Sequence, residues 1–230
     1  MRPVPKPTAA SRARGALRAL LQAYGTGHVK KRLWDVEFSK GRWDCLDRTP
    51  GDCVYPYLER YAKHGRILDL GCGSGSTGNE LDASAYASYV GVDISGVAIA
   101  RAQQRSEDNR RADKNRYQQS DIFSYVPDQS FDVILFRDSI YYIPRRHIRA
   151  MLRRYAQYLR DGGVFIVRMA DGAKYRDIVE TIADHFAVIE THVADDPRAV
   201  VLIFRSMEQS NAGVSASPLG SADTSQAPRR

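Results

Sequence analysis

The sequence is poor in cysteine and has no long apolar run. Its 230 residues include three cysteines, Cys45, Cys53 and Cys72, which are too few and too unevenly spaced for a disulfide framework or a zinc site. No apolar run approaches the roughly 18 residues that span a bilayer, and no segment that resembles a secretory signal opens the chain. We therefore expect a cytoplasmic protein without a metal site.

Acidic residues are absent from the first 33 positions, which contain eight of the Lys and Arg residues. Residues 207–230 contain two basic and two acidic residues, so the net charge of +7 leaves residues 34–206 with a charge of −1. The basic character thus belongs to an N-terminal arm, and the rest of the chain is close to neutral. This distribution argues against nucleic-acid binding by the protein as a whole.

Composition divides the chain into three segments. Residues 1–33 are the basic arm, and its first ten residues are rich in proline and expected to be disordered. Residues 34–206 are long enough for one globular domain with a substantial core. Residues 207–230 are mostly Ser, Ala, Gly and Pro, which predicts a disordered tail.

Within the arm, residues 11–24 predict a basic amphipathic helix. Its apolar residues recur at helical spacing at Leu17, Leu20, Leu21 and Tyr24. Such a helix packs on the domain, contacts an anionic membrane from the periphery, or acts as an Arg-rich targeting segment. The sequence leaves these three alternatives open.

The central segment alternates between apolar runs and helical stretches. The runs that predict strands are 66–71, 89–94, 117–122, 132–137 and 163–169. The stretches that predict helices are 53–63, 76–83, 95–110, 145–160 and 172–185. This alternation predicts a doubly wound α/β fold around a parallel sheet. Two further strands, 186–193 and 199–205, are separated by a turn too short for a helical crossover, so we expect an antiparallel pair at the end.

Ligands of such sheets bind beyond the carboxyl ends of the strands, where three polar sites follow predicted strands. A glycine loop occupies residues 69–78, Asp93 follows the second strand, and Asp121 with Ile122 follows the third. Glycines allow close approach of a ligand to the backbone. A carboxylate about 20 residues after the loop suits the hydroxyls of a ribose, and an acceptor beside a backbone N–H suits an adenine edge.

The glycine loop fits two cofactors. Gly73, Gly75 and Gly78 satisfy the G-x-G-x-x-G pattern of dinucleotide-binding proteins, which suits an NAD-dependent oxidoreductase. Asp69, however, lies on the strand just before the glycines. A carboxylate there suits the cationic amino group of a methionine moiety and would repel a pyrophosphate. No second domain remains for a dehydrogenase.

Taken together, "ILDLGCGSGSTGNEL", "YVGVDIS", "QSDIF", "FDVILFRDSIYYI" and "LRDGGVFIVRM" resemble, in order and spacing, the motifs of class I S-adenosylmethionine-dependent methyltransferases. The resemblance covers about residues 54–170. It implies S-adenosyl-L-methionine as cofactor and a Rossmann-like, mostly parallel seven-stranded sheet with a reversed last strand. It also assigns cofactor contacts: the methionine part at Asp69, Gly71, Gly73 and Gly75, the ribose at Asp93, and adenine at Ile94, Asp121 and Ile122.

The segment "LWDVEFSKGRWDCL" at residues 33–46 resembles the entry segment of bacterial methyltransferases that act on glycans and small metabolites. We therefore interpret residues 34–46 as a possible lid. Trp34 and Trp43 would then cover the cofactor or the acceptor, with Trp43 as a substrate contact. Packing of both side chains against the sheet edge is the alternative.

Residues after the fourth predicted strand are the candidates for acceptor binding and catalysis. Asp138 is a candidate general base for a hydroxyl acceptor, or alternatively the cap of the following turn. His147 is a second candidate base. Arg137 would bind the methionine carboxylate or an acidic substrate, and one of Tyr141 and Tyr142 is expected to face the site while the other packs in the core.

These observations predict SN2 transfer of a methyl group to a hydroxyl or amine of a small molecule or glycan. The alternatives are an NAD-binding oxidoreductase and a nucleic-acid methyltransferase that uses the basic arm. The second would show strongly salt-dependent binding. In the family that this chain resembles, nucleic-acid methyltransferases that act on amino groups carry an Asn-Pro-Pro-aromatic element after the fourth strand. This chain has "RDSIYY" at that place.

Overall fold

The computed structural model describes residues 15–207 except 16, 19, 23 and 194–197. The segments expected to be disordered, 1–10 and nearly all of 207–230, lie outside the described residues. The described positions between 15 and 24 are helical, as the sequence predicts.

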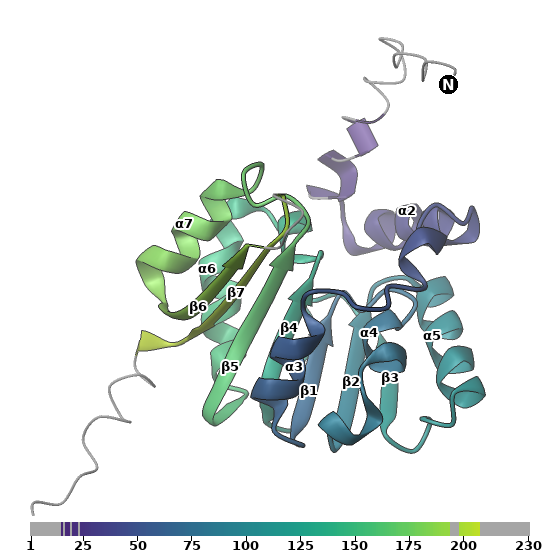
Figure 1. Ribbon diagram of the computed structural model, residues 1–230. Helices are drawn as coiled ribbons and strands as arrows, with labels where there is room; N and C mark the ends of the chain where they lie inside the picture. The colour runs from purple at the N-terminus through teal and green to yellow at the C-terminus, as the bar shows by residue number, and fades with distance from the viewer. Residues whose placement is uncertain (1–14, 16, 19, 23, 194–197, 208–230) are drawn as a thin grey trace, which may run out of the picture.

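The described residues include seven strands that form one sheet in the order β3-β2-β1-β4-β5-β7-β6 (Figure 1). The strands are β1 (Arg66–Leu70), β2 (Ser88–Asp93), β3 (Asn115–Gln119), β4 (Phe131–Arg137), β5 (Leu159–Met169), β6 (Ala187–Val193) and β7 (Val200–Arg205). Strands β1 to β5 pair in parallel, and β7 pairs antiparallel with both β5 and β6. The predicted fold class, including the antiparallel C-terminal pair, is confirmed.

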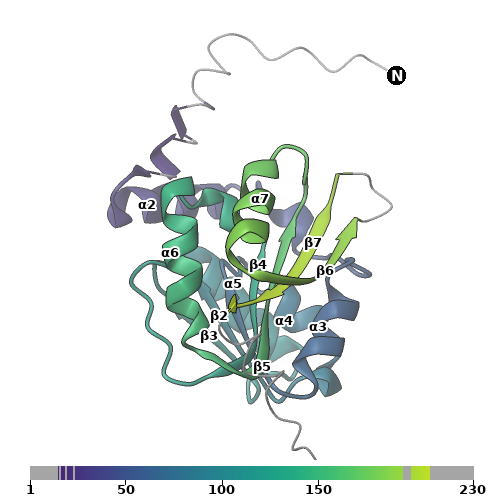
Figure 2. The ribbon, with the colours of Figure 1, turned by 90° about the vertical axis from the view of Figure 1, so that its left-hand side faces the viewer.

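Helices cover both faces of this sheet, as Figure 2 shows with α6 on one side and α3 on the other. The helices are α2 (Gly27–Ser39), α3 (Tyr55–Ala62), α4 (Ser76–Glu80), α5 (Gly96–Asp108), α6 (Arg145–Ala156) and α7 (Arg176–His185). Short 3-10 turns are η1 (Asp44–Leu46), η2 (Ala83–Ala85) and η3 (Ile140–Tyr142).

Alternate residues of the central strands pack in two separate hydrophobic clusters, because successive side chains of a strand point to opposite faces. In β4, Val133 and Leu135 belong to the cluster that includes α3 and α5. Ile134 and Phe136 belong to the cluster that includes α6 and α7. Burial on both faces explains why the parallel strands read as nearly continuous apolar runs.

Several predicted boundaries differ from the structure by a few residues, and two of these differences have a clear physical cause. The third strand ends at Gln119, and Asp121 instead accepts a hydrogen bond from the backbone N–H of Phe123 at 2.8 Å, which closes a turn. The helix predicted over residues 145–160 ends at Ala156. Strand β5 begins at Leu159, which pairs with Phe131 next to a register shift. Pairing with a neighbouring strand overrides the helical spacing at this point.

The boundary predicted between residues 33 and 34 falls inside α2. This helix packs against α5, and Asp35 joins the two by accepting hydrogen bonds from the Ser95 hydroxyl at 2.8 Å and the Val97 N–H at 3.4 Å. Glu37, buried in α2, pairs with Arg18 at 3.1 Å and with Arg42 at 2.7 Å. The basic arm is therefore continuous with the domain from residue 27 onward.

Candidate active site

A cavity of about 220 Å³ lies at the carboxyl ends of β1, β2, β4 and β5, where the strand order reverses between β1 and β4. Its roof is formed by residues of α2 and of the segment that follows it; we call residues 27–52 the roof. Most of the predicted site residues line this cavity: Trp43, Asp69, Gly71, Gly73, Asp93, Ile94, Asp121, Ile122, Arg137, Asp138 and Tyr142. Most residues predicted for the site thus surround a single cavity.

The glycines of the loop after β1 have different physical roles. Gly73 lines the cavity, and its φ of +54° favours glycine, although an added Cβ would only be in ordinary van der Waals contact with Phe38 at 3.6 Å. Gly71 has a φ of +87°, and an added Cβ would lie 2.4 Å from the Cβ of Ser139. Close packing of two strand ends, in addition to the φ angle, requires glycine at position 71.

Gly75 packs closely on a neighbouring helix. It is absent from the cavity lining, and a Cβ there would lie 2.7 Å from the Cβ of Ala102 on α5. Its φ of +76° turns the chain into α4. In the structure this glycine allows the close packing of the loop on α5, and its contact with the methionine part of the cofactor stays a prediction.

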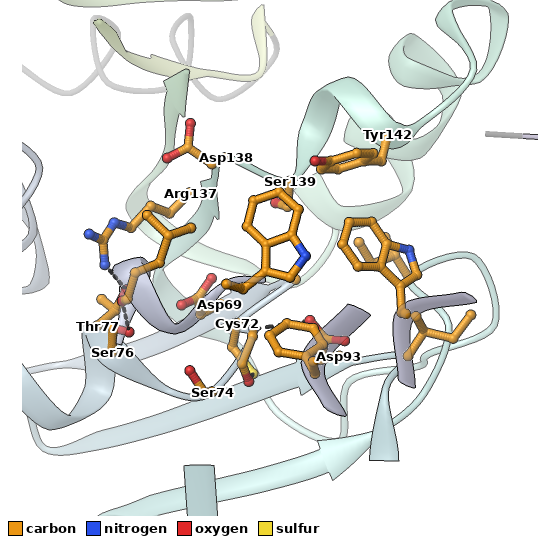
Figure 3. A pocket seen from close by; sticks show the side chains of 18 of the residues that line it. Asp69, Cys72, Ser74, Ser76, Thr77, Asp93, Arg137, Asp138, Ser139 and Tyr142 are labelled. Atoms are coloured by element: carbon orange, nitrogen blue, oxygen red, sulfur yellow. Dashed lines mark hydrogen bonds between the residues drawn. The ribbon is translucent and has the colours of Figure 1, made fainter. Parts of the chain in front are cut away.

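Asp69 is fully buried at the end of β1 and points toward the cavity (Figure 3). Its Oδ2 accepts a hydrogen bond from the hydroxyl of Tyr89, while its Oδ1 has no partner in the part of the chain that the structure describes. Burial raises the pKa of Asp69 to about 6. A buried carboxylate oxygen without a partner is costly, so this atom fits a cationic ligand group.

Asp93 is held by the backbone on both sides. Its Oδ2 accepts from the N–H of Gly73 at 3.0 Å and its Oδ1 from the N–H of Ser95 at 2.8 Å. Burial raises the pKa of Asp93 to about 6. Each carboxylate oxygen has a second lone pair, so the fixed carboxylate can still accept from two neighbouring hydroxyls.

Beyond Asp93, Ile94 and Ile122 line the same end of the cavity as Asp121. These two apolar side chains and one acceptor suit a flat heterocycle with a polar edge. The turn that Asp121 closes with Phe123 fixes the position of its carboxylate.

The roof is attached to the glycine loop and to α4 by several hydrogen bonds. The hydroxyl of Ser76 donates to the carbonyl of Leu46 at 2.5 Å, and the N–H of Thr49 donates to Glu80 Oε2 at 2.9 Å. The side chain of Ser74 donates to Asp47. The roof is thus part of the site.

Aromatic rings of the roof contact the ring of Tyr142, which follows strand β4. The Trp34 ring lies 5.8 Å from that of Trp43, 6.2 Å from that of Phe38 and 4.8 Å from that of Tyr142, which it meets edge-on. All four side chains line the cavity. Of the two alternatives for the tryptophans, the structure places both rings over the cavity.

Four charged side chains gather at the ends of β4 and β5. Arg137 pairs with Asp52 at 2.7 Å, Arg168 lies 3.8 Å from Asp52, and Arg168 also pairs with Asp138. Arg137 further donates to the Thr77 hydroxyl at 3.2 Å. Sequence reasoning missed Asp52 and Arg168, although Arg168 at a strand end follows the rule that identified the other residues.

Asp138 has a left-handed backbone conformation, with a φ of +54°. Its Oδ1 accepts from the N–H of Ala170 at 2.8 Å, and its Oδ2 accepts from Arg168. Burial raises the pKa of Asp138, and the two neighbouring guanidinium groups act against that shift. A non-glycine residue held in this conformation at a cavity is a common feature of functional sites.

The remaining candidates separate clearly. Tyr142 faces the cavity, whereas Tyr141 stacks on Tyr175 with ring centroids 4.3 Å apart and packs against the core. His147 is exposed and lies outside the cavity lining, with its ring edge-on to that of Phe123 at 5.9 Å. Tyr141 and His147 therefore do not line the cavity, because the helical turn at 140–142 and the start of α6 direct their side chains to Tyr175 and Phe123.

Residues 68–165 match a family model described as a methyltransferase domain. The chain is 28% identical to 27-O-demethylrifamycin SV methyltransferase of Amycolatopsis mediterranei over 140 residues, which cover 57% of this chain and 50% of that protein. It is 27% identical to the mRNA cap guanine-N(7) methyltransferase of Schizosaccharomyces pombe over 123 residues, 47% of this chain and 34% of that protein. The chain thus spans about half or less of the length of these relatives.

Solved structures share the fold. The N-methyltransferase NodS from Bradyrhizobium japonicum in complex with S-adenosyl-L-homocysteine matches with a TM-score of 0.61 at 19% identity, over 77% of this chain and 98% of that chain. Magnesium protoporphyrin IX methyltransferase from Synechocystis with bound SAM matches with a TM-score of 0.55 at 20% identity, over 87% of this chain and 100% of that chain.

Proposed function

We propose that the chain is a class I S-adenosylmethionine-dependent methyltransferase that methylates a hydroxyl or amine of a small molecule or glycan; the methyltransferase-domain match over residues 68–165 and the shared fold support this. The observation that carries the proposal is the roofed cavity of about 220 Å³, which has a carboxylate-lined half suited to the cofactor and a half with aromatic and paired charged side chains. A roof of this kind suits an acceptor that enters the cavity whole.

The residues present fit S-adenosylmethionine, which supplies a methyl group on a positively charged sulfur. We propose that the unpartnered Oδ1 of Asp69 receives the ammonium of its methionine part. Asp93 would accept from the ribose hydroxyls, and Gly73 would allow close approach of the ligand to the backbone. Ile94, Asp121 and Ile122 would enclose the adenine.

The family match decides between the two cofactors that the glycine pattern allows, in favour of S-adenosylmethionine. The structure supplies a physical reason. Asp69 Oδ1 is buried in the cavity without a partner, and a pyrophosphate beside it would place like charges together in a poorly solvated site.

At the acceptor end, we propose that Asp138 receives the proton of a hydroxyl acceptor. Its position is fixed from two sides, by Ala170 N–H and by Arg168, so its carboxylate presents one geometry to the cavity. Tyr142 and Trp43 would hold the acceptor between the strand end and the roof. Most of the rate enhancement would come from positioning and exclusion of water.

The relatives support two acceptor classes. The rifamycin relative acts, by its name, on a small molecule, and the near-neutral charge of residues 34–206 agrees with such an acceptor. The cap methyltransferase relatives favour a second candidate, an RNA end, which the basic arm would attract. RNA as acceptor predicts methyl transfer that falls steeply as salt is raised, whereas a neutral small molecule does not.

The experiment that tests the proposal has two stages. We expect calorimetry to detect S-adenosylmethionine binding in the micromolar range and no NAD(H) binding; NAD(H) binding alone would falsify the cofactor assignment. Transfer of labelled methyl is then screened over hydroxyl and amine compounds, oligosaccharides and capped RNA. Transfer to RNA alone would reject the small-molecule and glycan proposal.

Cofactor affinity should depend on pH, because the raised pKa values of Asp69 and Asp93 are both about 6. Below pH 6 these carboxylates are protonated in the unliganded protein, and each must lose its proton to hold the ligand in the proposed way. We expect the affinity for S-adenosylmethionine to fall about tenfold or more between pH 7 and pH 5. Calorimetry at both pH values measures this, and an affinity that is unchanged or higher at pH 5 contradicts the assignment.

Deletion of the roof should impair the enzyme, whereas deletion of the ends should not. A chain without residues 1–46 lacks Trp34, Trp43 and the contact of Asp35 with α5, so we expect a large loss of methyl transfer. Deletion of residues 1–10 and 210–230 should leave cofactor affinity unchanged. If the chain without residues 1–46 kept full activity, those residues of the roof would not be needed, and the site would consist of the residues at the strand ends.

A further inference from the structure

The described residues of the helical segment between 15 and 24 turn polar side chains toward the domain and apolar side chains toward solvent, which is the reverse of a typical helix on a soluble protein. Its polar side chains face the domain: Gln22 is 6% exposed and lines the cavity, and Arg18 pairs with the buried Glu37. Three of its apolar side chains face outward, with exposed fractions of 58% for Leu17, 56% for Leu20 and 58% for Tyr24, whereas Leu21 is partly buried. Helices on soluble domains normally bury such a stripe.

This stripe continues onto neighbouring elements. The guanidinium of Arg146, at the start of α6, lies 5.7 Å from the centre of the Tyr24 ring. The next residue, His147, meets the half-exposed ring of Phe123, and the ammonium of Lys30 lies 5.2 Å from that ring. We call Leu17, Leu20, Tyr24, Phe123, Lys30 and Arg146 the amphiphilic face. Figure 2 shows the N-terminal helical segment beside the upper end of α6.

Many cations surround the amphiphilic face, where the nearby acids Asp177 and Asp121 bind Arg145 and the N–H of Phe123. Helix α6 has the sequence RRHIRAMLRRYA without an acidic residue, and Arg149 and Arg153 are exposed. The two acidic residues of α2 turn away from this face, because Asp35 binds Ser95 of α5 and Glu37 is buried. Exposed apolar side chains bordered by cations match the chemistry of an anionic bilayer surface, where aliphatic groups enter the acyl boundary and cations meet lipid headgroups.

We propose that the amphiphilic face docks this protein on the surface of an anionic phospholipid bilayer. The leucines favour a bilayer over a nucleic acid, because phosphates would engage the cations but leave the isobutyl groups in water. No helix in the described part of the chain is long and apolar enough to cross a membrane, so the contact is interfacial. Gln22 and Lys30 also line the cavity, so docking brings the cavity close to the lipid surface. The proposal is independent of the acceptor.

The test is sedimentation of the full chain with vesicles of phosphatidylcholine, either alone or mixed with phosphatidylglycerol. We expect binding to the mixed vesicles only, and weaker binding at high ionic strength because salt screens the cations. Leu17→Ser with Leu20→Ser should weaken binding at least about tenfold. The matched control is Val188→Ser with Ile189→Ser, which removes two exposed apolar side chains of β6, 39% and 45% exposed, and should bind like the unmodified protein.

Several results would overturn the proposal. These are no binding to the mixed vesicles, equal loss in both double variants, and a leucine variant that binds as before. Self-association of the unmodified chain that disappears in the leucine variant, without vesicle binding, would assign the face to a second copy of the chain. Retention of RNA that is insensitive to the leucine substitutions, again without vesicle binding, would assign the cations to nucleic acid.

Discussion

Asp138→Asn is expected to lower turnover of a hydroxyl acceptor about 10²-fold or more, with S-adenosylmethionine affinity nearly unchanged. The substitution suits the question, because asparagine tolerates the φ of +54° that this position requires, whereas alanine would be strained. Asparagine can still accept from the N–H of Ala170 through its amide oxygen, but its amide nitrogen cannot accept from Arg168, so that hydrogen bond is lost together with the negative charge and the basicity. Turnover of the acceptor found in the labelling screen is the measurement, with binding checked by calorimetry.

His147→Ala is the matched control for Asp138→Asn. His147 was predicted as a second candidate base, but it is exposed and lies outside the cavity lining, so its loss should change turnover no more than about twofold. A large loss for His147→Ala beside a small one for Asp138→Asn would move the base to the histidine. Small losses in both variants would favour an amine acceptor, which needs no base when uncharged.

The cofactor end of the site could be predicted from the sequence because it depends on local rules. Strand ends are visible as the ends of apolar runs, and the fold places those ends at one edge. Once the strands were identified, their ends therefore predicted three cavity-lining carboxylates, those of Asp69, Asp93 and Asp121. The differences in strand and helix boundaries did not move any of these side chains out of the site.

At the acceptor end the same rule identified Arg137 and Asp138, but it could not identify Asp52, which pairs with Arg137 through packing between distant segments. Arg168 stands in the apolar run of β5, and its two partners are Asp52 of the roof and Asp138 after β4. Nothing local to residue 52 marks it as a partner of β5. Gly75 satisfies a ligand-binding pattern, but its close contact with Ala102, on a helix later in the chain, could not be predicted from that pattern.

Asp93→Ala is expected to weaken S-adenosylmethionine binding about 10- to 150-fold, because hydrogen bonds to a charged group contribute about 1.5–3 kcal/mol. The structure adds a cost to folding, since the substitution leaves the N–H groups of Gly73 and Ser95 without their acceptor. Loss of a buried carboxylate with a raised pKa offsets part of that cost. Thermal unfolding without cofactor shows whether the variant folds.

Asp69→Asn provides the comparison that separates a ribose contact from general damage to the loop. Both carboxylates are buried at adjacent strand ends, but they are proposed to hold different parts of the ligand. Methylthioadenosine keeps the ribose and adenine and lacks the amino-acid part. Asp93→Ala should therefore weaken both ligands by a similar factor, whereas Asp69→Asn should weaken S-adenosylmethionine about tenfold or more and methylthioadenosine hardly at all. If both substitutions weakened both ligands equally, the loop would be damaged in each variant. If the Asp93→Ala protein bound methylthioadenosine normally, the ribose would be held by other residues.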